Sequence, residues 1–215
     1  MEVNMRGLIY KDVSLFFKYL DKKLIVLLAG AVALVMYAVG EYAGGVTSVM
    51  FGATVGLQHI MCFAGDEKAD WKKYQLAMPV SSYYVVISKY ISVIYTLAVS
   101  IIGSLLFNLL AVFLFHSFDP YVLGFSIIAA IIVPLLCTAV CLPLSYWFGF
   151  QLARTMGSFV VVIPMLLFLN YFEAEPELSI ATASLHSYVL FALIATLILF
   201  GASILISKAG YDRKK

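Results

Sequence analysis

The sequence predicts an all-α, polytopic membrane protein, and the observations behind this prediction are its composition and the length of its apolar runs. Hydrophobic residues make up 63% of the 215 residues and charged residues only 12%, and the mean hydropathy is +1.00. Such a composition is too apolar for a water-soluble surface around a core. A helix needs about 20 apolar residues to cross the bilayer core. Six segments meet this requirement and fill most of a single membrane domain, 1–215: 24–40, 43–64, 85–115, 121–148, 152–171 and 187–207.

The charged residues predict the orientation of these six transmembrane helices. All 14 lysines and arginines fall on the side of the N-terminus when Lys89 is assigned to the inner end of its span. Because positively charged residues are retained in the cytoplasm, we expect both termini and segment 65–82 to be cytoplasmic and segment 173–186 to face outward. The outer side carries only acidic residues: Glu41, Asp119, Glu173, Glu175 and Glu177. Topology and anionic lipid explain the basic inner rim, so we expect no nucleic-acid partner.

Residues 6–20 predict an N-terminal amphipathic helix that lies at the membrane interface. Polar residues recur in it at a spacing of three to four, as at Lys11, Ser14 and Lys18. Its other face is apolar and consists of Leu8, Ile9, Val13, Phe16, Phe17 and Leu20. A helix with these two faces lies in the plane of the membrane surface. We therefore expect 6–20 to rest on the inner leaflet before the chain turns into the first span near Asp21.

The first two spans, 24–40 and 43–64, contain small residues four positions apart. These are Ala29 and Ala33 in the first span and Gly52 and Gly56 in the second. Small residues at this spacing let helices approach closely, and we favour packing within one subunit over an interface between subunits. The polar residues deepest in the predicted spans are Gln58, His59 and Asn108. They are either functional groups or hydrogen-bonding contacts between helices.

Segment 65–82, between the second and third spans, places charged residues around Trp71 and Tyr74. Residues 66–76 can form a three-turn helix, because acidic residues come early and lysines late, as the helix dipole favours, and Pro79 ends it. Two interpretations remain open. The segment is either a docking element for a partner or an interfacial loop whose aromatic side chains lie among the lipid headgroups.

The third and fourth spans have features that need an explanation. A helix over 85–115 would be about 46 Å long, longer than the apolar core, so we expect its start to protrude into the cytosol, with Lys89 reaching the inner interface. Segment 121–148 contains Pro134 and Pro143, which predict a kinked helix. A re-entrant hairpin is the alternative. It is less favoured because it would put Arg154 or the basic C-terminus on the outer face.

No catalytic, metal-binding or cofactor-binding site is predicted in the chain. It lacks the phosphate loop G-x-x-x-x-G-K-[ST] and the motifs H-E-x-x-H, G-x-S-x-G and C-x-x-C. The histidines lie at different predicted depths, and the three cysteines are expected to pack as small apolar side chains. We therefore expect a chain that is not an enzyme.

Three stretches carry a resemblance to a known family: M-R-G-L-I-Y-K-D at 5–12, D-E-K-x-x-W-x-K-Y-x-L-x-x-P-V-S at 66–81 and S-K-Y at 88–90. They resemble the permease subunits of bacterial ATP-binding-cassette (ABC) exporters of the type-two class, which include phenol-soluble-modulin and bacteriocin exporters. The resemblance covers essentially the whole chain, although the large extracellular domain of some relatives is lacking. It implies that the N-terminal helix and the loop 65–82 contact the ATPase. The implied ATPase-coupling residues are Arg6, Lys11, Asp66, Glu67, Lys68, Asp70, Trp71, Lys72 and Tyr74.

The resemblance also implies an assembly. Two cytosolic ABC ATPase subunits would bind ATP and Mg²⁺, and they would drive two permeases, identical or paralogous, in the bacterial cell membrane. The predicted spans present Phe, Leu, Ile and Val with no charged pocket, which suits hydrophobic or amphipathic cargo, and we favour small peptides. The alternative is a noncatalytic membrane-anchoring or regulatory subunit that recruits a cytosolic partner. An intramembrane enzyme is third, because no nucleophile with a base can be assembled.

The predicted orientation can be tested by cysteine labelling in a chain whose natural cysteines are removed. Lys72→Cys should be protected from a membrane-impermeant maleimide in intact cells, because segment 65–82 is expected in the cytoplasm. Glu175→Cys, in the expected outer segment, should react and serves as the positive control. Reaction of Lys72→Cys in intact cells would overturn the orientation.

Overall fold

The computed structural model describes residues 5–68, 71, 74, 81–159 and 181–213. Within this part the regular structure is helical and contains no strand. The elements are α1 (Met5–Lys18), α2 (Lys22–Val39), the short 3₁₀ helix η1 (Gly40–Tyr42), α3 (Ala43–Lys68), α5 (Ser82–Phe115), α6 (Pro120–Phe148) and α8 (Ala181–Arg213). Residues 150–159 are also helical.

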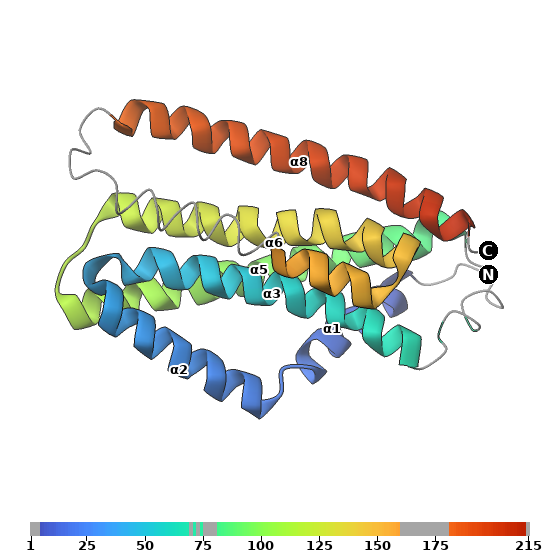
Figure 1. Ribbon diagram of the computed structural model, residues 1–215, viewed down its shortest axis with the longest axis horizontal. Helices are drawn as coiled ribbons and strands as arrows, with labels where there is room; N and C mark the ends of the chain where they lie inside the picture. The colour runs from blue at the N-terminus through green and yellow to red at the C-terminus, as the bar shows by residue number, and fades with distance from the viewer. Residues whose placement is uncertain (1–4, 69–70, 72–73, 75–80, 160–180, 214–215) are drawn as a thin grey trace.

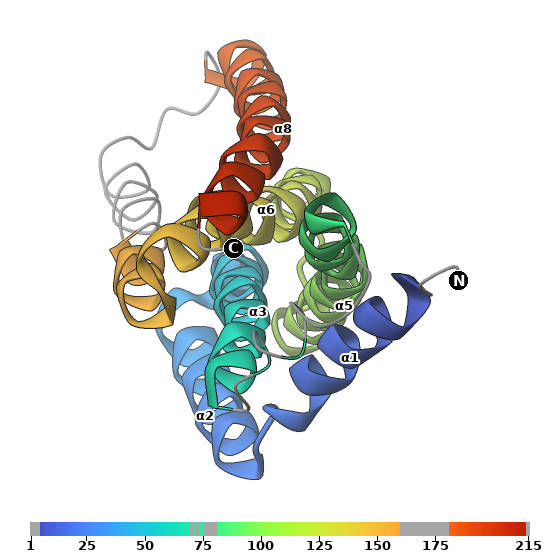
Figure 2. The same ribbon diagram turned by 90° about the vertical axis from the view of Figure 1, so that its right-hand side faces the viewer.

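The long helices form an up-and-down bundle. Helices α3, α5 and α6 run side by side along the long axis, and α2 and α8 lie on opposite flanks (Figures 1 and 2). Figure 2, which looks along this axis, shows α1 lying crosswise over one end of the bundle. The C-terminal end of α8 lies at that same end, whereas η1 lies at the opposite end (Figure 1). The crosswise helix therefore meets the bundle where α3 ends and α5 begins.

By length and composition, four segments of the described residues could cross a membrane: Lys22–Asp66, Ser82–Phe115, Pro120–Phe148 and Leu190–Arg213. The first of them contains both α2 and α3, which fold back on each other at η1 (Figure 1). Gly40 allows this turn because its φ of +65° is a conformation that residues with a Cβ rarely adopt. The all-helical, membrane-spanning class is thus confirmed. The number of six spans stays a prediction, because the expected span 152–171 falls largely outside the described residues.

Helix α6 is one continuous helix from Pro120 to Phe148, with both prolines inside it. The re-entrant hairpin considered for this segment is therefore wrong. Pro134 has no N–H to donate to the carbonyl of Ala130, four residues earlier. The Ser100 hydroxyl of α5 donates a hydrogen bond of 2.8 Å to that carbonyl instead. A neighbouring helix thus satisfies the group that the proline leaves free, as the bilayer interior requires.

At a position away from the crosswise helix α1, Asn108 links α3, α5 and α6. Its Nδ2 donates to the hydroxyl of Ser48 on α3, at 3.3 Å, and its Oδ1 accepts from the hydroxyl of Ser126 on α6, at 3.2 Å. Ser104 of α5 donates to the Ser48 hydroxyl at 2.7 Å. These bonds favour the interpretation of Asn108 as a hydrogen-bonding contact between helices.

The glycine pair of the second span packs within the chain. A Cβ added to Gly56 would lie 2.8 Å from the Cβ of Cys137 and 3.1 Å from the Cα of Pro134, and Gly52 also faces Pro134. The pair therefore brings α3 against α6, as expected for packing within one subunit. By contrast, Ala29 and Ala33 on α2 line an apolar groove of about 700 Å³ between α2 and α5.

A comparison of two glycine substitutions, one on α3 and one on α2, tests this packing. Gly56→Ala should destabilise the chain by about 1–3 kcal/mol, because the backbone of α6 cannot yield to the added methyl. Gly30→Ala on α2 is the matched control, because nothing lies within 4 Å of its Cβ position and alanine improves helix propensity by about 1 kcal/mol. Thermal unfolding of both variants in one detergent measures the effect. Equal stability of the two variants would contradict the close approach of α3 and α6.

Candidate functional site at the junction of α1, α3 and α5

One face of α1 is buried against the bundle. Its buried residues are Leu8, Asp12 and Phe16, spaced four apart and therefore on the same side of the helix. Phe16 packs in a cluster with Val55 and Cys62 of α3. The aromatic and aliphatic members of this face account for its burial by the hydrophobic effect. An acidic residue between them requires a partner, because a buried carboxylate without one is costly.

The partners of Asp12 are Lys11 and Lys89. With Asp66 these residues form a ring of four charged side chains, which we call the charge quartet. Lys11 Nζ lies 2.6 Å from Asp66 Oδ1 and 3.2 Å from Asp12 Oδ1. Lys89 Nζ lies 2.8 Å from Asp66 Oδ2 and 3.2 Å from Asp12 Oδ1. Each lysine thus contacts both aspartates. The ring joins α1, the last turns of α3 and the early part of α5.

The charge quartet is withdrawn from solvent. Asp12 is 1% exposed and Lys89 is 4% exposed, whereas the side chains of Asp66 and Lys11 are 14% and 23% exposed. With two positive and two negative charges the ring is neutral, so each buried charge has two opposite charges beside it. Removing charges from water is expensive, and only close pairing with good hydrogen bonds offsets that cost. The four side chains therefore have to stay together for α1 to remain docked.

Burial and the neighbouring positive charges have opposite effects on the pKa of Asp12. Burial raises the pKa of the Asp12 carboxyl, whereas the ammonium groups of Lys89 and Lys11, the nearby His59 and the hydrogen bond from Lys89 lower it, and together they outweigh burial. As a result, the pKa lies below its ordinary value of 3.8. The carboxylate is therefore ionised in the docked state, and it stabilises that state at pH values above its unfolded pKa.

Aromatic rings and a thiol surround the charge quartet. Lys89 Nζ lies 4.3 Å from the centre of the Phe63 ring, and Lys11 Nζ lies 4.7 Å from the centre of a Trp71 ring. A cation over an aromatic face is favourable, and more so when it is desolvated. The Cys62 thiol donates to the backbone carbonyl of Asp12 at 3.3 Å. Buried contacts therefore hold both the charges and the backbone of α1.

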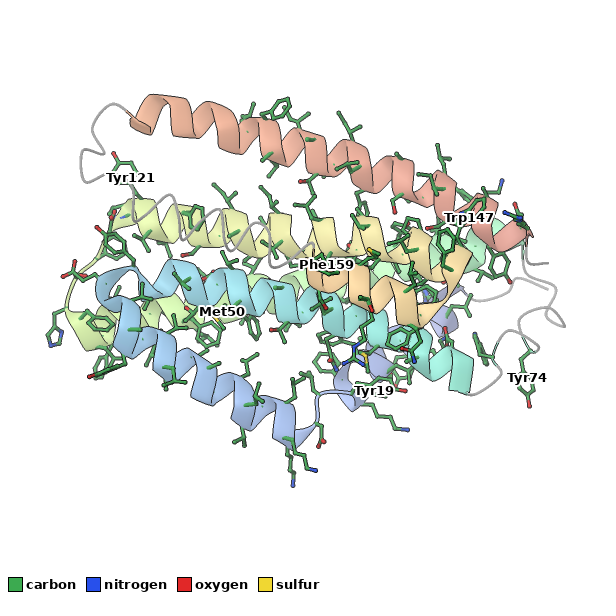
Figure 3. The ribbon with its side chains drawn as sticks, viewed as in Figure 1. Tyr19, Met50, Tyr74, Tyr121, Trp147 and Phe159 are labelled. Atoms are coloured by element: carbon green, nitrogen blue, oxygen red, sulfur yellow. The ribbon has the colours of Figure 1, made fainter. Side chains whose placement is uncertain are left out.

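A glycine allows the close approach of α1 to α3. A Cβ added to Gly65 would lie 2.8 Å from the Tyr19 hydroxyl oxygen and 3.6 Å from Leu15. Tyr19 lies just beyond the end of α1 and is labelled in Figure 3, where it is seen beside the junction. Because Gly65 directly precedes Asp66, this approach also places the Asp66 carboxylate within reach of both lysines.

The structure brings together some of the residues predicted from sequence. Lys11 and Asp66 are in direct contact, and Trp71 lies against Lys11. Tyr74 is 64% exposed, its ring centre is 6.3 Å from that of Trp71, and Figure 3 shows it pointing away from the bundle. Arg6 is exposed on α1. Of the remaining predicted residues, Glu67 and Lys68 belong to α3 but their side chains lie outside the described part, as do Asp70 and Lys72 altogether.

Sequence reasoning did not identify Asp12, and it did not predict the pairing of Lys89. Lys89 is buried and paired with two aspartates. Pairing inside the protein spares the lysine from lipid without requiring it to reach water. A signal was present in the sequence, because Asp12 is the one acidic residue between Leu8 and Phe16 on the apolar face of its helix. Because each of the two charges needs a partner of opposite sign when it is buried, Asp12 and Lys89 could have been paired from the sequence.

The described residues around the charge quartet support charge pairing and not metal binding. Within the described residues, no group of three or more histidine, cysteine or acidic side chains could hold a metal ion. The same part of the chain leaves four polar atoms buried without a hydrogen-bond partner: Gln58 Nε2, His59 Nδ1, Trp71 Nε1 and Tyr146 Oη. The arrangement fixes the relative position of three helices at the end of the bundle.

Comparison with known proteins gives one match. A family model described as "ABC-2 family transporter protein" matches residues 7–212, which is nearly the whole chain. No curated protein and no solved structure matches it. The matched region includes almost all of α1 and extends nearly to the end of α8.

Removal of one member of the charge quartet should be costly. Lys89→Ala leaves Asp12 and Asp66 buried with only Lys11 between them, and breaking a buried pair in this way costs about 3–5 kcal/mol. Lys18→Ala, at an exposed position on α1, should change stability by about 0.5 kcal/mol or less. Equilibrium unfolding of both variants in mixed micelles measures the difference. Equal stability of the two variants would show that the pairing of Lys89 with the two aspartates does not stabilise the chain.

Proposed function

The chain belongs to the ABC-2 family of transporter proteins, and on this basis we propose that it is the permease subunit of an ABC exporter for hydrophobic or amphipathic cargo. Membership of this family makes it a membrane component of an ABC transporter and not the ATPase. The finer proposal is that it exports small amphipathic peptides across the bacterial cell membrane. Two copies of a separate ATPase would bind ATP and Mg²⁺, and a second permease, identical or paralogous, would complete the assembly.

The observation that carries the proposal is the match over residues 7–212 together with the rigid junction of α1 with α3 and α5. An ATPase can move a membrane bundle only through elements that are firmly attached to it. Helix α1 is such an element, because buried charges and Phe16 hold it. It also lies crosswise at the end of the bundle (Figure 2), where a cytosolic partner would have access to it in the proposed orientation.

The outward face of α1 and the nearby aromatic residues favour this end as the docking surface. Tyr10 and Phe17, seven residues apart on one side of α1, are both exposed, and so is Tyr74. Exposed aromatic residues are frequent anchors in protein interfaces. We propose that the ATPase contacts these side chains, together with Arg6 and the loop 65–82.

The apolar character of the described surface supports the proposed cargo. Large exposed hydrophobic side chains cover the long helices, among them Leu106 and Phe113 of α5 and Leu197 of α8. The four charges of the charge quartet are already paired with one another. Such surfaces suit an amphipathic molecule better than an ion or a sugar.

Co-expression with a candidate ABC ATPase from the same organism tests the proposal. The purified chain alone should hydrolyse no ATP, since it contains no phosphate loop. It should co-purify with the ATPase as an assembly of two permeases and two ATPases, and amphipathic peptides should stimulate hydrolysis by that assembly. Hydrolysis by the chain alone would refute the proposal. An assembly that binds the ATPase but never moves or responds to cargo would indicate an anchoring subunit.

Docking of the ATPase should depend on the aromatic residues at the junction. Tyr74→Ala and Trp71→Ala should each weaken the affinity by roughly 30-fold, the equivalent of about 2 kcal/mol for a truncated interface anchor. Tyr37→Ala on α2 is the matched control, because Tyr37 is a highly exposed aromatic residue on a helix that flanks the bundle. Binding of the ATPase to each variant in lipid nanodiscs provides the measurement. Wild-type affinity in both loop variants would leave α1 as the candidate docking surface.

A further inference from the structure

We infer that Asp12 and Lys89 are positioning residues for energy coupling: through the charge quartet they make α1 and α5 move as one body when the ATPase displaces α1. This inference rests on the proposed function, because it names the route by which movement at the docking surface reaches a membrane helix. Neither residue is expected to touch the ATPase, since both are buried. They act through the helices that they join.

The route follows direct contacts from the surface inward. Trp71, in the segment between α3 and α5, lies against the Lys11 ammonium. Lys11 contacts Asp66 at the end of α3 and Asp12 on the inner face of α1. Both aspartates contact Lys89, which lies two turns inside α5 and not at its first residue. Movement of the docking surface is therefore transmitted to the interior of a long helix.

Charge pairing gives this junction a single register, which apolar packing alone would not. Apolar side chains can slide along one another with gradual loss of contact. The charge quartet has two opposite neighbours for every charge, so a shift of α1 by one turn would leave buried charges unpaired. Such a state is strongly disfavoured. The junction is therefore either closed in one register or open, and while it is closed α1 cannot move without α5.

The chain contains a natural reporter of this junction. Cys62 is 1% exposed and its thiol is bonded to the backbone of Asp12, so α1 covers it. Opening of the junction would uncover Cys62 for alkylation. Cys137 and Cys141, also buried, would be replaced by serine so that Cys62 is the single thiol.

The first experiment measures alkylation of Cys62 by N-ethylmaleimide in the full chain, reconstituted in nanodiscs without the ATPase. Lys89→Gln should raise the rate by about tenfold or more, because it leaves two buried aspartates with one lysine. The control Lys18→Gln, at an exposed position of α1, should not. Exchanging all four charges, with Lys11→Asp, Asp12→Lys, Asp66→Lys and Lys89→Asp, restores the alternation of the ring and should restore protection. If Cys62 stays protected in Lys89→Gln, the inference is wrong.

The second experiment asks whether the closed junction transmits movement, which a merely structural role would not reveal. Spin labels at Lys18 on α1, Tyr95 on α5 and Leu205 on α8, all exposed positions, report helix distances in the complex with the ATPase. On trapping with ATP and vanadate, the α1 to α5 distance should stay constant in the wild type while the α1 to α8 distance changes. In Lys89→Gln the α1 to α5 distance should change as well.

The two failures can be told apart. If the wild-type chain does not bind the ATPase, the proposed function fails and the coupling role fails with it, whatever the alkylation rates are. If the wild type binds the ATPase but its α1 to α5 distance changes on trapping, only the inference about Asp12 and Lys89 is overturned. Rescue of both protection and constant distance by the inverted charge quartet would support it.

Discussion

The constraint on which the junction depends is that four charges removed from water have to remain paired. Asp12 and Lys89 are almost inaccessible, and each is stable there only because the ring closes through Lys11 and Asp66. This requirement fixes the rotation of α1 about its own axis, since Leu8 and Phe16 must then also face the bundle. It also fixes the end of α3 against the early part of α5. The arrangement of the proposed docking surface follows from these positions.

The remainder of the bundle relies on weaker and more local interactions. Hydroxyl and amide groups around Asn108 join α3, α5 and α6, and small residues such as Gly56 let the helices approach. Neutral hydrogen bonds of this kind are worth about 0.6 kcal/mol each within membranes. The molecule therefore combines a centre held by many modest contacts with one end held by a few strong ones. A transporter subunit of this construction can change the packing of its centre while the end of the bundle stays intact.

The sequence was sufficient for features that depend on one helix at a time. Apolar length predicted the helical, membrane-spanning class, and the expected starts and ends of the spans agree with α2, α3, α5 and α6 to within a few residues. Proline in 121–148 raised the question of a hairpin. The segment stays one helix, and the neighbouring Ser100 satisfies the carbonyl that Pro134 leaves free. The pairing of Lys89 with Asp12 was missed because spacing along a chain does not reveal a partner that lies 77 residues away. Asp12 went unnoticed for the same reason. Lys11 and Asp66, in contrast, were selected through resemblance and then found in contact.

The order of the four charges along the chain has a consequence for biosynthesis. Lys11, Asp12 and Asp66 all precede Lys89, so both aspartates have been synthesised before Lys89 emerges from the ribosome. A lysine entering the bilayer alone would cost about 3 kcal/mol at the helix centre. In this chain Asp12 and Asp66 have already been synthesised and are expected at the membrane surface. Insertion of α5 and docking of α1 can therefore occur as one step, and a chain that lacks residues 1–12 would have to insert Lys89 with Asp66 as its remaining partner.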